Sequence, residues 1–291
     1  MNHTYSITGH TGLTGLLGSP VSHSLSPMMH NEAFQLLGLD YVYLCFDVGE
    51  DSLETAVKGL KACGIRGFNL TMPDKNRMAE LADELSPAAR MIGAVNTVVN
   101  ENGTLVGHNT DGVGFMRSAR ESGFQPAGQT MTILGAGGAS TAICAQAALD
   151  GIKTLNIFAR PTSRFHQRTL HLVDEINSTT NCRAALYDLA DTSSLKTALR
   201  ESSLLVNATS VGMAPDTEHS ILEDPAFFHS RLMVADIIYN PRETRFLQLA
   251  KSAGCAVFNG LHMLLYQGAE AFRLWTGHEM PVEPIKEKYF R

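Results

Sequence analysis

Three clusters of polar residues interrupt the first 112 residues at positions where an apolar core would otherwise continue. They are His23-Ser24-Leu25-Ser26-Pro27, Asn69-Leu70-Thr71-Met72-Pro73-Asp74-Lys75, and Asn96-Thr97 with Asn109-Thr110-Asp111-Gly112. All three fall at the ends of expected strands, where open α/β sheets place ligand-binding groups. Together they supply hydroxyls, amides, a cation and a carboxylate, a set that suits a small, polyhydroxylated carboxylic acid.

Each cluster also has a purely structural interpretation. Ser26 could serve only as an N-cap in front of Pro27, and the segment 109–112 could be a turn that caps a helix starting near Val113. A lysine that follows a Met-Pro step, as Lys75 does, is usually exposed to solvent. No pair of Cys or His residues has metal-ligand spacing, so we expect no metal site.

A glycine-rich segment, ILGAGGAS at 133–140, joins an expected buried strand to an expected helix. In this context Gly135 allows a tight turn, and Gly137 lets the backbone approach a pyrophosphate at the helix N-terminus. The third small position is Ser140, where glycine or alanine is usual. The segment predicts dinucleotide binding, and a tight turn without a ligand is the alternative.

The residues that close the next strand indicate which dinucleotide is bound. An NAD site usually places Asp or Glu there, whereas this strand ends in FARPTSR, with Arg160, Thr162 and Arg164 and no acid. Two guanidinium groups and a hydroxyl suit a 2′-phosphate, and each charge-assisted hydrogen bond contributes ~1.5–3 kcal/mol. We therefore expect NADP as the cofactor, with NAD also possible and a solvated loop as the alternative.

The composition is that of an ordinary soluble protein. The chain has 291 residues, of which 44% are hydrophobic and 18% charged. No apolar stretch approaches the ~20 residues that cross a bilayer, and the polar N-terminus does not resemble a secretory signal. Five scattered cysteines without CxxC spacing predict reduced thiols in the cytoplasm. A net charge of −6 without a basic cluster argues against nucleic acid as a partner.

Strand-like and helical patterns alternate along the chain, as is typical of α/β architecture. In the first part, strands are expected at 13–18, 41–48 and 65–72, helices at 26–38 and 51–64, and a hairpin with an Asn102-Gly103 turn at 95–112. In the second part, a strand and the loop after it are expected at 130–138, further strands at 154–160, 204–213 and 232–240, and helices at 139–151 and 261–277.

These patterns predict two domains. Residues 1–112 form an α/β domain with a mostly parallel sheet, and residues 113–261 form a Rossmann-type nucleotide domain. We expect the boundary in the helix around 113–123. The C-terminal segment 262–291 could return to either domain, including packing back on the first.

Taken in order, these residues resemble the shikimate dehydrogenase family over nearly the whole chain. The matching motifs are GSPVSHSLSPMMHNEAF, NLTMPDK, GAVNTVVN, GHNTDGVGF, ILGAGGAS, NATSVGM, IIYNP and GLHMLLYQGAEAFRLWTG. The segments SPAARMIGAVNTVVN and GAGGASTAI are more similar to the quinate/shikimate dehydrogenase branch than to the strictly biosynthetic one.

The resemblance implies reversible, NADP(H)-dependent reduction of 3-dehydroshikimate to shikimate in aromatic amino acid biosynthesis, in a cleft between the two domains. One alternative is a quinate/shikimate dehydrogenase that uses NAD or NADP. A non-catalytic shikimate or quinate sensor is less favoured, because a sensor needs neither Lys75 nor Asp111. Another Rossmann enzyme, such as a methyltransferase, does not account for the first domain. The partner is a small-molecule substrate, and the chain is expected to be a monomer or homodimer.

The resemblance also implies roles for individual residues. The catalytic lysine falls on Lys75, paired with Asp111, and acid-base help of this kind typically contributes ~10²–10⁴-fold to the rate. The substrate-binding positions are Ser24 and Ser26 for the carboxylate, with Thr71, Asn96, Tyr239, Gln267 and Asp111. The cofactor positions are Gly135, Ala136, Gly137, Gly138 and Ala139 in the glycine loop, Ala159, Arg160, Thr162 and Arg164 at the ribose phosphate, and Ile237 and Gly260 at the nicotinamide.

Three features depart from the family pattern. Asp74 precedes the lysine where the family has Phe, Asn or a similar residue, and its charge either perturbs Lys75 or points to water. His262 replaces a glycine close to the cofactor pocket. Ala159 and Pro161 stand where the NADP-type branch has Asn and Thr, while Thr162 stands where the NAD-tolerant branch often has an aspartate.

Overall fold

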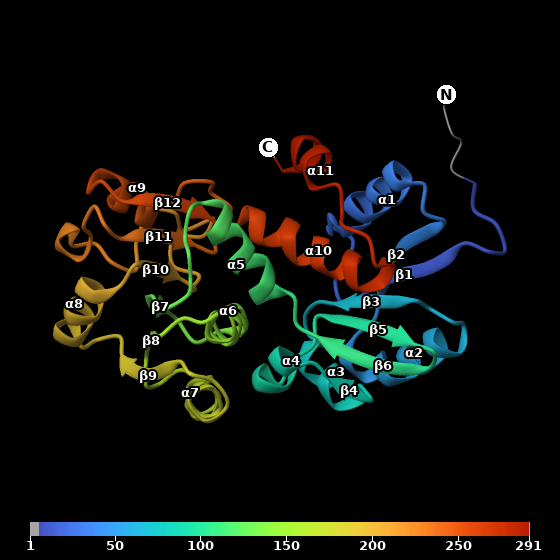
Figure 1. Ribbon diagram of the computed structural model, residues 1–291, viewed down its shortest axis with the longest axis horizontal. Helices are drawn as coiled ribbons and strands as arrows, with labels where there is room; N and C mark the ends of the chain where they lie inside the picture. The colour runs from blue at the N-terminus through green and yellow to red at the C-terminus, as the bar shows by residue number, and fades with distance from the viewer. Residues whose placement is uncertain (1–5, 291) are drawn as a thin grey trace. The chain divides into compact units, whose positions relative to one another are not determined.

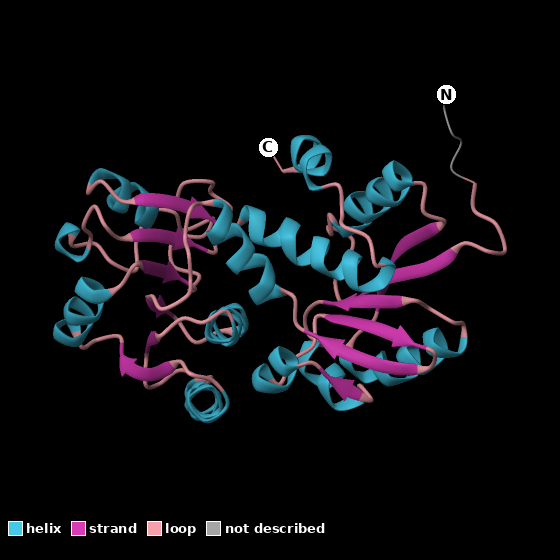
Figure 2. Cartoon of the chain, in the orientation of Figure 1, coloured by secondary structure: helices cyan, strands magenta, loops and turns pink. Residues whose placement is uncertain are grey.

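The computed structural model describes residues 6–290, which form two units with one sheet in each (Figure 1). The first unit comprises the residues up to Thr110 together with those from Gln267 onward, and the second comprises Asp111–Tyr266. The long helix α10, Leu261–Thr276, therefore contributes residues to both units. Helices and strands alternate in each unit, as expected of an α/β protein (Figure 2).

The first sheet has the strand order β2-β1-β3-β5-β6-β4. Its strands are β1 Gly12–Gly18, β2 Tyr41–Asp47, β3 Gly67–Leu70, β4 Glu84–Leu85, β5 Thr97–Glu101 and β6 Thr104–His108. Three of the five pairings are parallel, and the two antiparallel pairings both involve β5. The predicted hairpin is confirmed, with Asn102 at φ 54° in the turn.

The helices of the first unit are α1 Ser26–Leu37, α2 Glu50–Ala62, α3 Lys75–Leu81, α4 Pro87–Ile92 and α11 Val282–Tyr289. The prediction that Ser26 is an N-cap was wrong, because Ser26 is the first residue of α1 and Leu25 occupies the cap position. The Ser24 hydroxyl instead accepts a hydrogen bond from the Ser26 amide at 3.2 Å, so a different serine satisfies this first amide. α1 ends as predicted, at Gly38 with φ 64°.

Apolar residues pack on both faces of the first sheet. Because side chains alternate along a strand, Phe68 and Asn69 of β3 point to opposite faces. On the Phe68 face the core consists of Leu17, Leu53, Val57, Ile65, Phe68, Leu70, Met78, Ala89, Val95, Val98 and Leu105. On the Asn69 face, an aromatic cluster joins α1, β2 and α10 through His30, Phe34, Tyr43, Phe272 and Trp275. Each fully buried Leu or Phe contributes ~1.5–3 kcal/mol to stability.

The second sheet is entirely parallel, with the strand order β12-β11-β10-β7-β8-β9. Its strands are β7 Thr130–Leu134, β8 Thr154–Ala159, β9 Arg183–Asp188, β10 Leu204–Asn207, β11 Met233–Asp236 and β12 Ala256–Asn259. Its helices are α5 Asp111–Glu121, α6 Gly138–Leu149, α7 His166–Thr179, α8 Thr192–Glu201 and α9 Arg245–Ser252, with a 3₁₀ turn at Pro225–Phe227.

Two strands of this sheet are shorter than predicted. β10 ends at Asn207 and β11 at Asp236, so the expected strands at 204–213 and 232–240 were too long. The physical reason is the same in both. The Asn207 side chain accepts a hydrogen bond from the Thr209 amide and the Asp236 side chain accepts one from the Ile238 amide, each at 3.0 Å. Such Asx turns offer the backbone an alternative to the sheet ladder.

Among residues 6–290, no helix is both long and apolar enough to cross a bilayer.

Candidate functional site

The predicted polar clusters of the first unit meet at one edge of its sheet. Residues 19–25 follow β1 and Thr71 follows β3, while Asn96 immediately precedes β5. β1 and β3 run parallel and β5 runs antiparallel to β3, so the ends of β1 and β3 lie beside the start of β5. Thr97 also pairs with His108, which brings the segment after β6 to the same edge.

Asn96 is the centre of a buried hydrogen-bond network at this edge. Its Oδ1 accepts hydrogen bonds from the Thr110 amide at 2.8 Å and from the Thr97 hydroxyl at 3.0 Å. Its Nδ2 donates to Thr110 Oγ1 at 3.0 Å and to Gln267 Oε1 at 3.4 Å. The structure thus brings together Asn96 and Gln267, two predicted substrate-binding residues that lie 171 positions apart.

A tyrosine that the sequence did not single out extends this network. The Tyr43 hydroxyl donates to Asn69 Oδ1 at 2.8 Å, and Asn69 Nδ2 donates to Thr97 Oγ1 at 3.0 Å. Burial raises the pKa of Tyr43 well above its usual value, and a hydrogen bond with the Ser26 side chain offsets part of this rise. Tyr43 thus belongs to the asparagine network through its bond to Asn69. It was missed because it lies within an expected strand, and its only signal is a phenol in an apolar run.

Lys75 is the first residue of α3 and is half-buried. Its carbonyl oxygen accepts a hydrogen bond from the Val95 amide at 2.8 Å, which joins the start of α3 to the segment before β5. The preceding residue, Asp74, is completely buried, so the alternative that its carboxylate points to water was wrong. Burial, followed by the charge of Glu50, raises the pKa of Asp74 to about 6.

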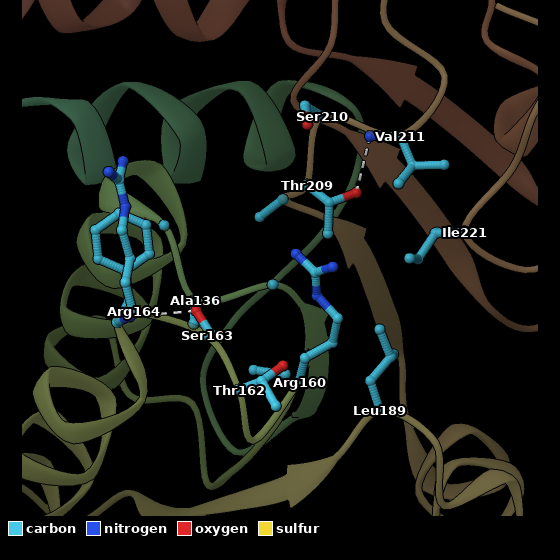
Figure 3. A pocket seen from close by; sticks show the side chains of 15 residues that line it. Ala136, Arg160, Thr162, Ser163, Arg164, Leu189, Thr209, Ser210, Val211 and Ile221 are labelled. Atoms are coloured by element: carbon cyan, nitrogen blue, oxygen red, sulfur yellow. Dashed lines mark hydrogen bonds between the residues drawn. The ribbon is translucent and has the colours of Figure 1, made fainter. Parts of the chain in front are cut away.

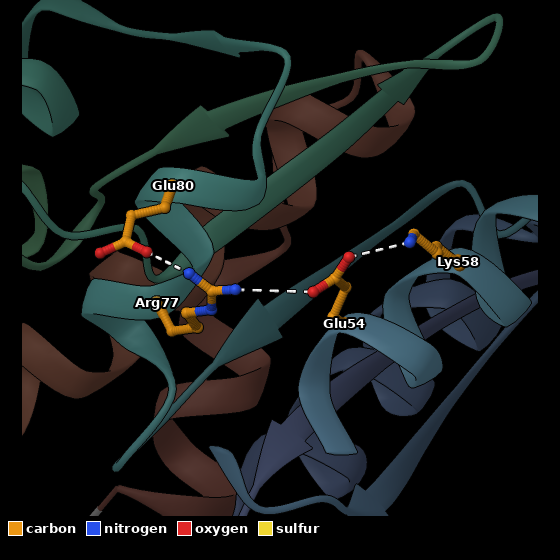
Figure 4. A network of polar contacts seen from close by, with 4 residues as sticks. All are labelled: Glu54, Lys58, Arg77 and Glu80. Atoms are coloured by element: carbon orange, nitrogen blue, oxygen red, sulfur yellow. Dashed lines mark hydrogen bonds and ion pairs between the residues drawn. The ribbon is translucent and has the colours of Figure 1, made fainter. Parts of the chain in front are cut away.

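A surface network of charged residues joins α3 to α2 (Figure 4). Arg77 of α3 pairs with Glu80 on its own helix and contacts Glu54 of α2 at 3.5 Å. Glu54 in turn pairs with Lys58 at 2.8 Å. Exposed pairs of this kind contribute only ~0–1 kcal/mol each, so the network adds little to the stability of the fold.

In the second unit, the glycine turn has the predicted geometry. Gly135 has φ 113°, and a Cβ added there would lie 2.7 Å from the Ala208 carbonyl oxygen. Any side chain would therefore be strained and would clash with the neighbouring loop. The Ser140 hydroxyl donates to the Gly135 carbonyl at 2.7 Å, which explains how serine is accommodated at the third small position.

A cavity of about 610 Å³ opens beside this turn (Figure 3). Seven of the eleven predicted cofactor residues line it, namely Gly135, Ala136, Gly137, Ala159, Arg160, Thr162 and Arg164. The other four, Gly138, Ala139, Ile237 and Gly260, are not among its lining residues. The other lining residues, which were not among the predicted cofactor residues, are Ser163, Phe165, Leu189, Ala208, Thr209, Ser210, Val211 and Ile221. Thr209 and its neighbours were missed because the segment was expected to be strand.

The side chains of the two arginines that line this cavity point in different directions. In Figure 3 the Arg160 side chain extends across the cavity toward Thr209, whereas Arg164 projects away from it. The guanidinium carbon of Arg164 lies 4.6 Å from the centroid of the Phe165 ring. A cation over an exposed aromatic face gains ~0.5–1 kcal/mol. Arg160 is therefore the arginine better placed to meet an anion inside the cavity.

The remaining predicted residues of the second unit lie on other segments. Ile237 and Tyr239 follow β11, and the Tyr239 side chain is exposed. Gly260 packs against Ile237, since a Cβ at Gly260 would lie 1.9 Å from the Ile237 carbonyl oxygen. Asp111 is the half-buried first residue of α5. In α10, the centroids of the His262 and Tyr266 rings lie 6.0 Å apart.

Known proteins resemble the chain over almost its whole length. Residues 16–98 match the shikimate dehydrogenase substrate binding domain, and residues 260–288 match the shikimate 5'-dehydrogenase C-terminal domain. The chain is 50% identical to a shikimate dehydrogenase (NADP(+)) of Listeria innocua, over 99% of this chain and 98% of that protein.

Solved structures show the same likeness. Shikimate 5-dehydrogenase from Listeria monocytogenes, in complex with shikimate and NAD, is 50% identical with a TM-score of 0.94, over 97% of each chain. Quinate dehydrogenase from Corynebacterium glutamicum, in complex with NAD, is 30% identical with a TM-score of 0.84, over 96% of this chain and 99% of that one.

Proposed function

This chain belongs to the shikimate dehydrogenase family, and we propose that it catalyses the reversible NADP(H)-dependent reduction of 3-dehydroshikimate to shikimate in aromatic amino acid biosynthesis. The observation that carries this proposal is the 50% identity to a shikimate dehydrogenase (NADP(+)) over 99% of the chain. The polar network of the first unit and the cavity beside the glycine turn of the second support it independently.

The first unit offers the groups that shikimate requires. A carboxylate is a strong hydrogen-bond acceptor, which suits the hydroxyl groups of Ser24 and Ser26. The ring hydroxyls both donate and accept, which suits Thr71, Asn96 and Gln267. Since Asn96 is held by its network, its amide is oriented before the substrate arrives, and less ordering entropy is lost on binding. In this proposal Tyr239 contributes a further hydroxyl.

Lys75 is proposed to move the proton. When a hydride reaches the carbonyl carbon of 3-dehydroshikimate, the oxygen becomes an alkoxide and takes a proton from the Lys75 ammonium group. In the reverse direction the neutral amine accepts that proton. Asp111 is proposed to hold a neighbouring ring hydroxyl beside the reacting carbon.

The second unit suits NADP(H), which supplies the hydride when bound. The glycine turn leaves room where a Cβ at Gly135 would collide, and α6 begins at Gly138 with free backbone amides, so both suit a pyrophosphate. Arg160, Thr162 and Arg164 are the proposed partners of the 2′-phosphate. β8 ends at Ala159 without an acid that would repel this phosphate. Ile237 and Gly260 are proposed to border the nicotinamide.

Quinate oxidation is the second candidate activity. The likeness to the quinate dehydrogenase of Corynebacterium glutamicum favours it, together with the motifs shared with the quinate/shikimate branch. Quinate carries an extra hydroxyl on the carbon that bears the carboxylate, so the Ser24 and Ser26 region decides between the substrates. A sensor without catalysis is less favoured, because Lys75 and Asp111 are both present.

The experiment that tests the proposal is an initial-rate assay with four substrate pairs. Purified protein is given shikimate or quinate, each with NADP⁺ or NAD⁺, and nicotinamide absorbance is followed. We expect turnover mainly with shikimate and NADP⁺. Comparable turnover with quinate or NAD⁺ would favour the second candidate. Protein that binds shikimate but turns over no pair would contradict both activities and favour the sensor.

The proposal also includes a cytoplasmic location and a monomeric or homodimeric state. The described cysteines are all unpaired, in keeping with a reducing compartment. Light scattering on the purified protein distinguishes a mass near the 31.6 kDa of one chain from twice that value.

A further inference from the structure

Asp236, the last residue of β11, is a completely buried carboxylate with three hydrogen-bond donors. The Thr244 hydroxyl donates to Oδ2 at 2.7 Å, and the Ile238 amide donates to Oδ1 at 3.0 Å. The Asn207 side-chain amide lies 3.2 Å from each oxygen. Asp236 therefore joins its own loop to the end of β10 and to the start of α9.

One side of this junction leads to the cavity beside the glycine turn. Asn207 is itself completely buried, and its Oδ1 accepts from the Thr209 amide at 3.0 Å and from the Thr209 hydroxyl at 2.7 Å. Thr209 Oγ1 then accepts from the Val211 amide at 3.2 Å. Thr209 and Val211 both line the cavity, so the chain of hydrogen bonds from Asp236 ends at its wall.

The same loop packs directly on the glycine turn. A Cβ at Gly135 would lie 2.7 Å from the Ala208 carbonyl oxygen and 3.0 Å from Thr209 Cγ2. A shift of this loop toward Gly135 would therefore close the space above the turn, and a shift away would open it.

The other side of the junction fixes the segment after β11. Thr244, which donates to Asp236, is also the N-cap of α9 and accepts a hydrogen bond from the Leu247 amide at 3.4 Å. The segment 237–243 is thus held at both ends. Its middle is held as well, because the Ala214 amide donates to the Asn240 carbonyl at 3.1 Å.

The carboxylate accomplishes something that an apolar residue could not. Burial raises the pKa of Asp236 to about 6, although the hydrogen bonds from Thr244, Ile238 and Asn207 lower it. Placing a carboxylate here therefore costs stability. Unlike an apolar side chain, however, the carboxylate accepts hydrogen bonds from donors on three segments at once. Such a fully satisfied buried group fixes a unique arrangement of those segments.

We propose that Asp236 is a positioning residue of the dinucleotide site, which holds the cavity loop 207–211 against the glycine turn and fixes the segment 237–244 at the same time. The inference rests on the proposed function, because it concerns the NADP(H) site of that enzyme. Asp236 does not line the cavity. It acts through Asn207 and Thr244.

The test is the affinity for NADP⁺, measured by titration calorimetry on the full chain. Asp236→Asn keeps the size of the side chain but replaces one acceptor oxygen by a donor that faces other donors. We expect its dissociation constant for NADP⁺ to rise about tenfold or more, as for the loss of one well-formed hydrogen bond. Shikimate affinity, measured without cofactor, should fall less, because Tyr239 is the one proposed substrate residue in the segment that Asp236 fixes. Asp150→Asn, a carboxylate that accepts from Gln146 at 2.9 Å, is the matched control.

A double-mutant cycle separates positioning from general destabilisation. If Asp236 acts in part through Asn207, then Asp236→Asn combined with Asn207→Ala should weaken NADP⁺ binding by clearly less than the sum of the two single losses. Fully additive losses, or unchanged NADP⁺ affinity in Asp236→Asn, would overturn the inference. An equal loss of shikimate affinity with a lowered Tm would also overturn it.

Should Asp236→Asn fail to fold, Thr244→Val and Thr244→Ser supply the same comparison. The serine variant keeps the hydroxyl and should bind NADP⁺ as the wild type does, whereas the valine variant should bind it more weakly. Equal affinities of these two variants would overturn the inference. Failure of the proposed function would appear separately, as a wild-type protein that does not turn over shikimate, because these affinities are measured without catalysis.

Discussion

The imidazole ring of His30 stacks on the ring of Tyr43, with 4.5 Å between the ring centroids and 10° between the planes. His30 is completely buried, and neither of its nitrogens has a hydrogen-bond partner among the described residues. Phe272 and Trp275 flank the same ring. A charged imidazolium would find no acceptor in this aromatic cluster, and burial accordingly lowers the pKa of His30 to about 3.

The first prediction follows from this pKa. An unfolded chain binds a proton at His30 as the pH falls through 6.5, whereas the folded protein does so only near 3. The contribution of His30 to stability is therefore complete above pH 6.5 and is lost as the pH falls below it. Between pH 8 and pH 5 the loss is ~2 kcal/mol. His30→Phe keeps the ring stacking, so its free energy of unfolding should gain ~2 kcal/mol relative to wild type over this range.

Chemical denaturation at pH 8 and pH 5 measures this difference. His171→Phe, at an exposed position, controls for the loss of a histidine. Stability curves for wild type and His30→Phe that remain parallel between pH 8 and pH 5 would show that the unfolded protein does not gain the proton in this way.

The second prediction concerns the hydroxyl of Tyr43. Tyr43→Phe preserves the stacking with His30 but removes the hydrogen bond to Asn69 Oδ1. Leaving a buried acceptor without its donor costs ~1–3 kcal/mol, so the free energy of unfolding should fall by that amount. Denaturant titration measures the change. Tyr187→Phe, in β9 of the other unit, is the control, and an equal loss there would contradict a specific role for the Tyr43–Asn69 bond.

Local patterns in the sequence predicted the elements that local chemistry determines. The Asn102-Gly103 turn and the glycine turn at Gly135 were both expected, because few residues tolerate their backbone conformations. The ends of β10 and β11 were not, since apolar residues recur after Asn207 and Asp236, at Ala208, Val211, Ile237 and Ile238. Only the side-chain bonds to Thr209 and Ile238 end those strands.

Contacts between distant residues account for what was missed at the candidate site. Tyr43 and Asn69 lie 26 positions apart, on β2 and β3, and their side chains meet across β1, which lies between these two strands. No spacing rule predicts that pairing. The predicted polar residue Asn96 was identifiable because it breaks the apolar pattern, whereas Tyr43 fits the pattern and its hydroxyl was overlooked.

The third prediction tests Lys75 as the proton donor. Lys75→Ala should lower kcat for shikimate oxidation by ~10²–10⁴-fold, because the reacting hydroxyl loses the base that accepts its proton. The dissociation constant for shikimate should change much less, since Ser24, Ser26 and Asn96 are retained. Steady-state kinetics and calorimetry give the two values. Lys58→Ala, at an exposed residue of α2, is the matched control, and near-normal turnover of Lys75→Ala would remove Lys75 from the mechanism.

The fourth prediction separates the two arginines of the cavity. Arg160 extends across the cavity toward Thr209, whereas the Arg164 guanidinium lies over the Phe165 ring, 4.6 Å from its centroid. Arg160→Gln should therefore weaken NADP⁺ binding by ~10- to 100-fold, the equivalent of one charge-assisted hydrogen bond. NAD⁺ binding should change little, because NAD⁺ has no 2′-phosphate. Arg164→Gln should have the smaller effect on NADP⁺.

Calorimetric titration of each variant with NADP⁺ and NAD⁺ provides all four affinities under one set of conditions. Arg183→Gln, at the exposed first residue of β9, controls for the change in net charge. Since interaction with a phosphate is screened by salt, the loss in Arg160→Gln should shrink as the ionic strength rises. Equal losses for NADP⁺ and NAD⁺ would mean that Arg160 contacts a part that both cofactors share, such as the adenine or the pyrophosphate. The preference for NADP would then have to come from Thr162 or Arg164.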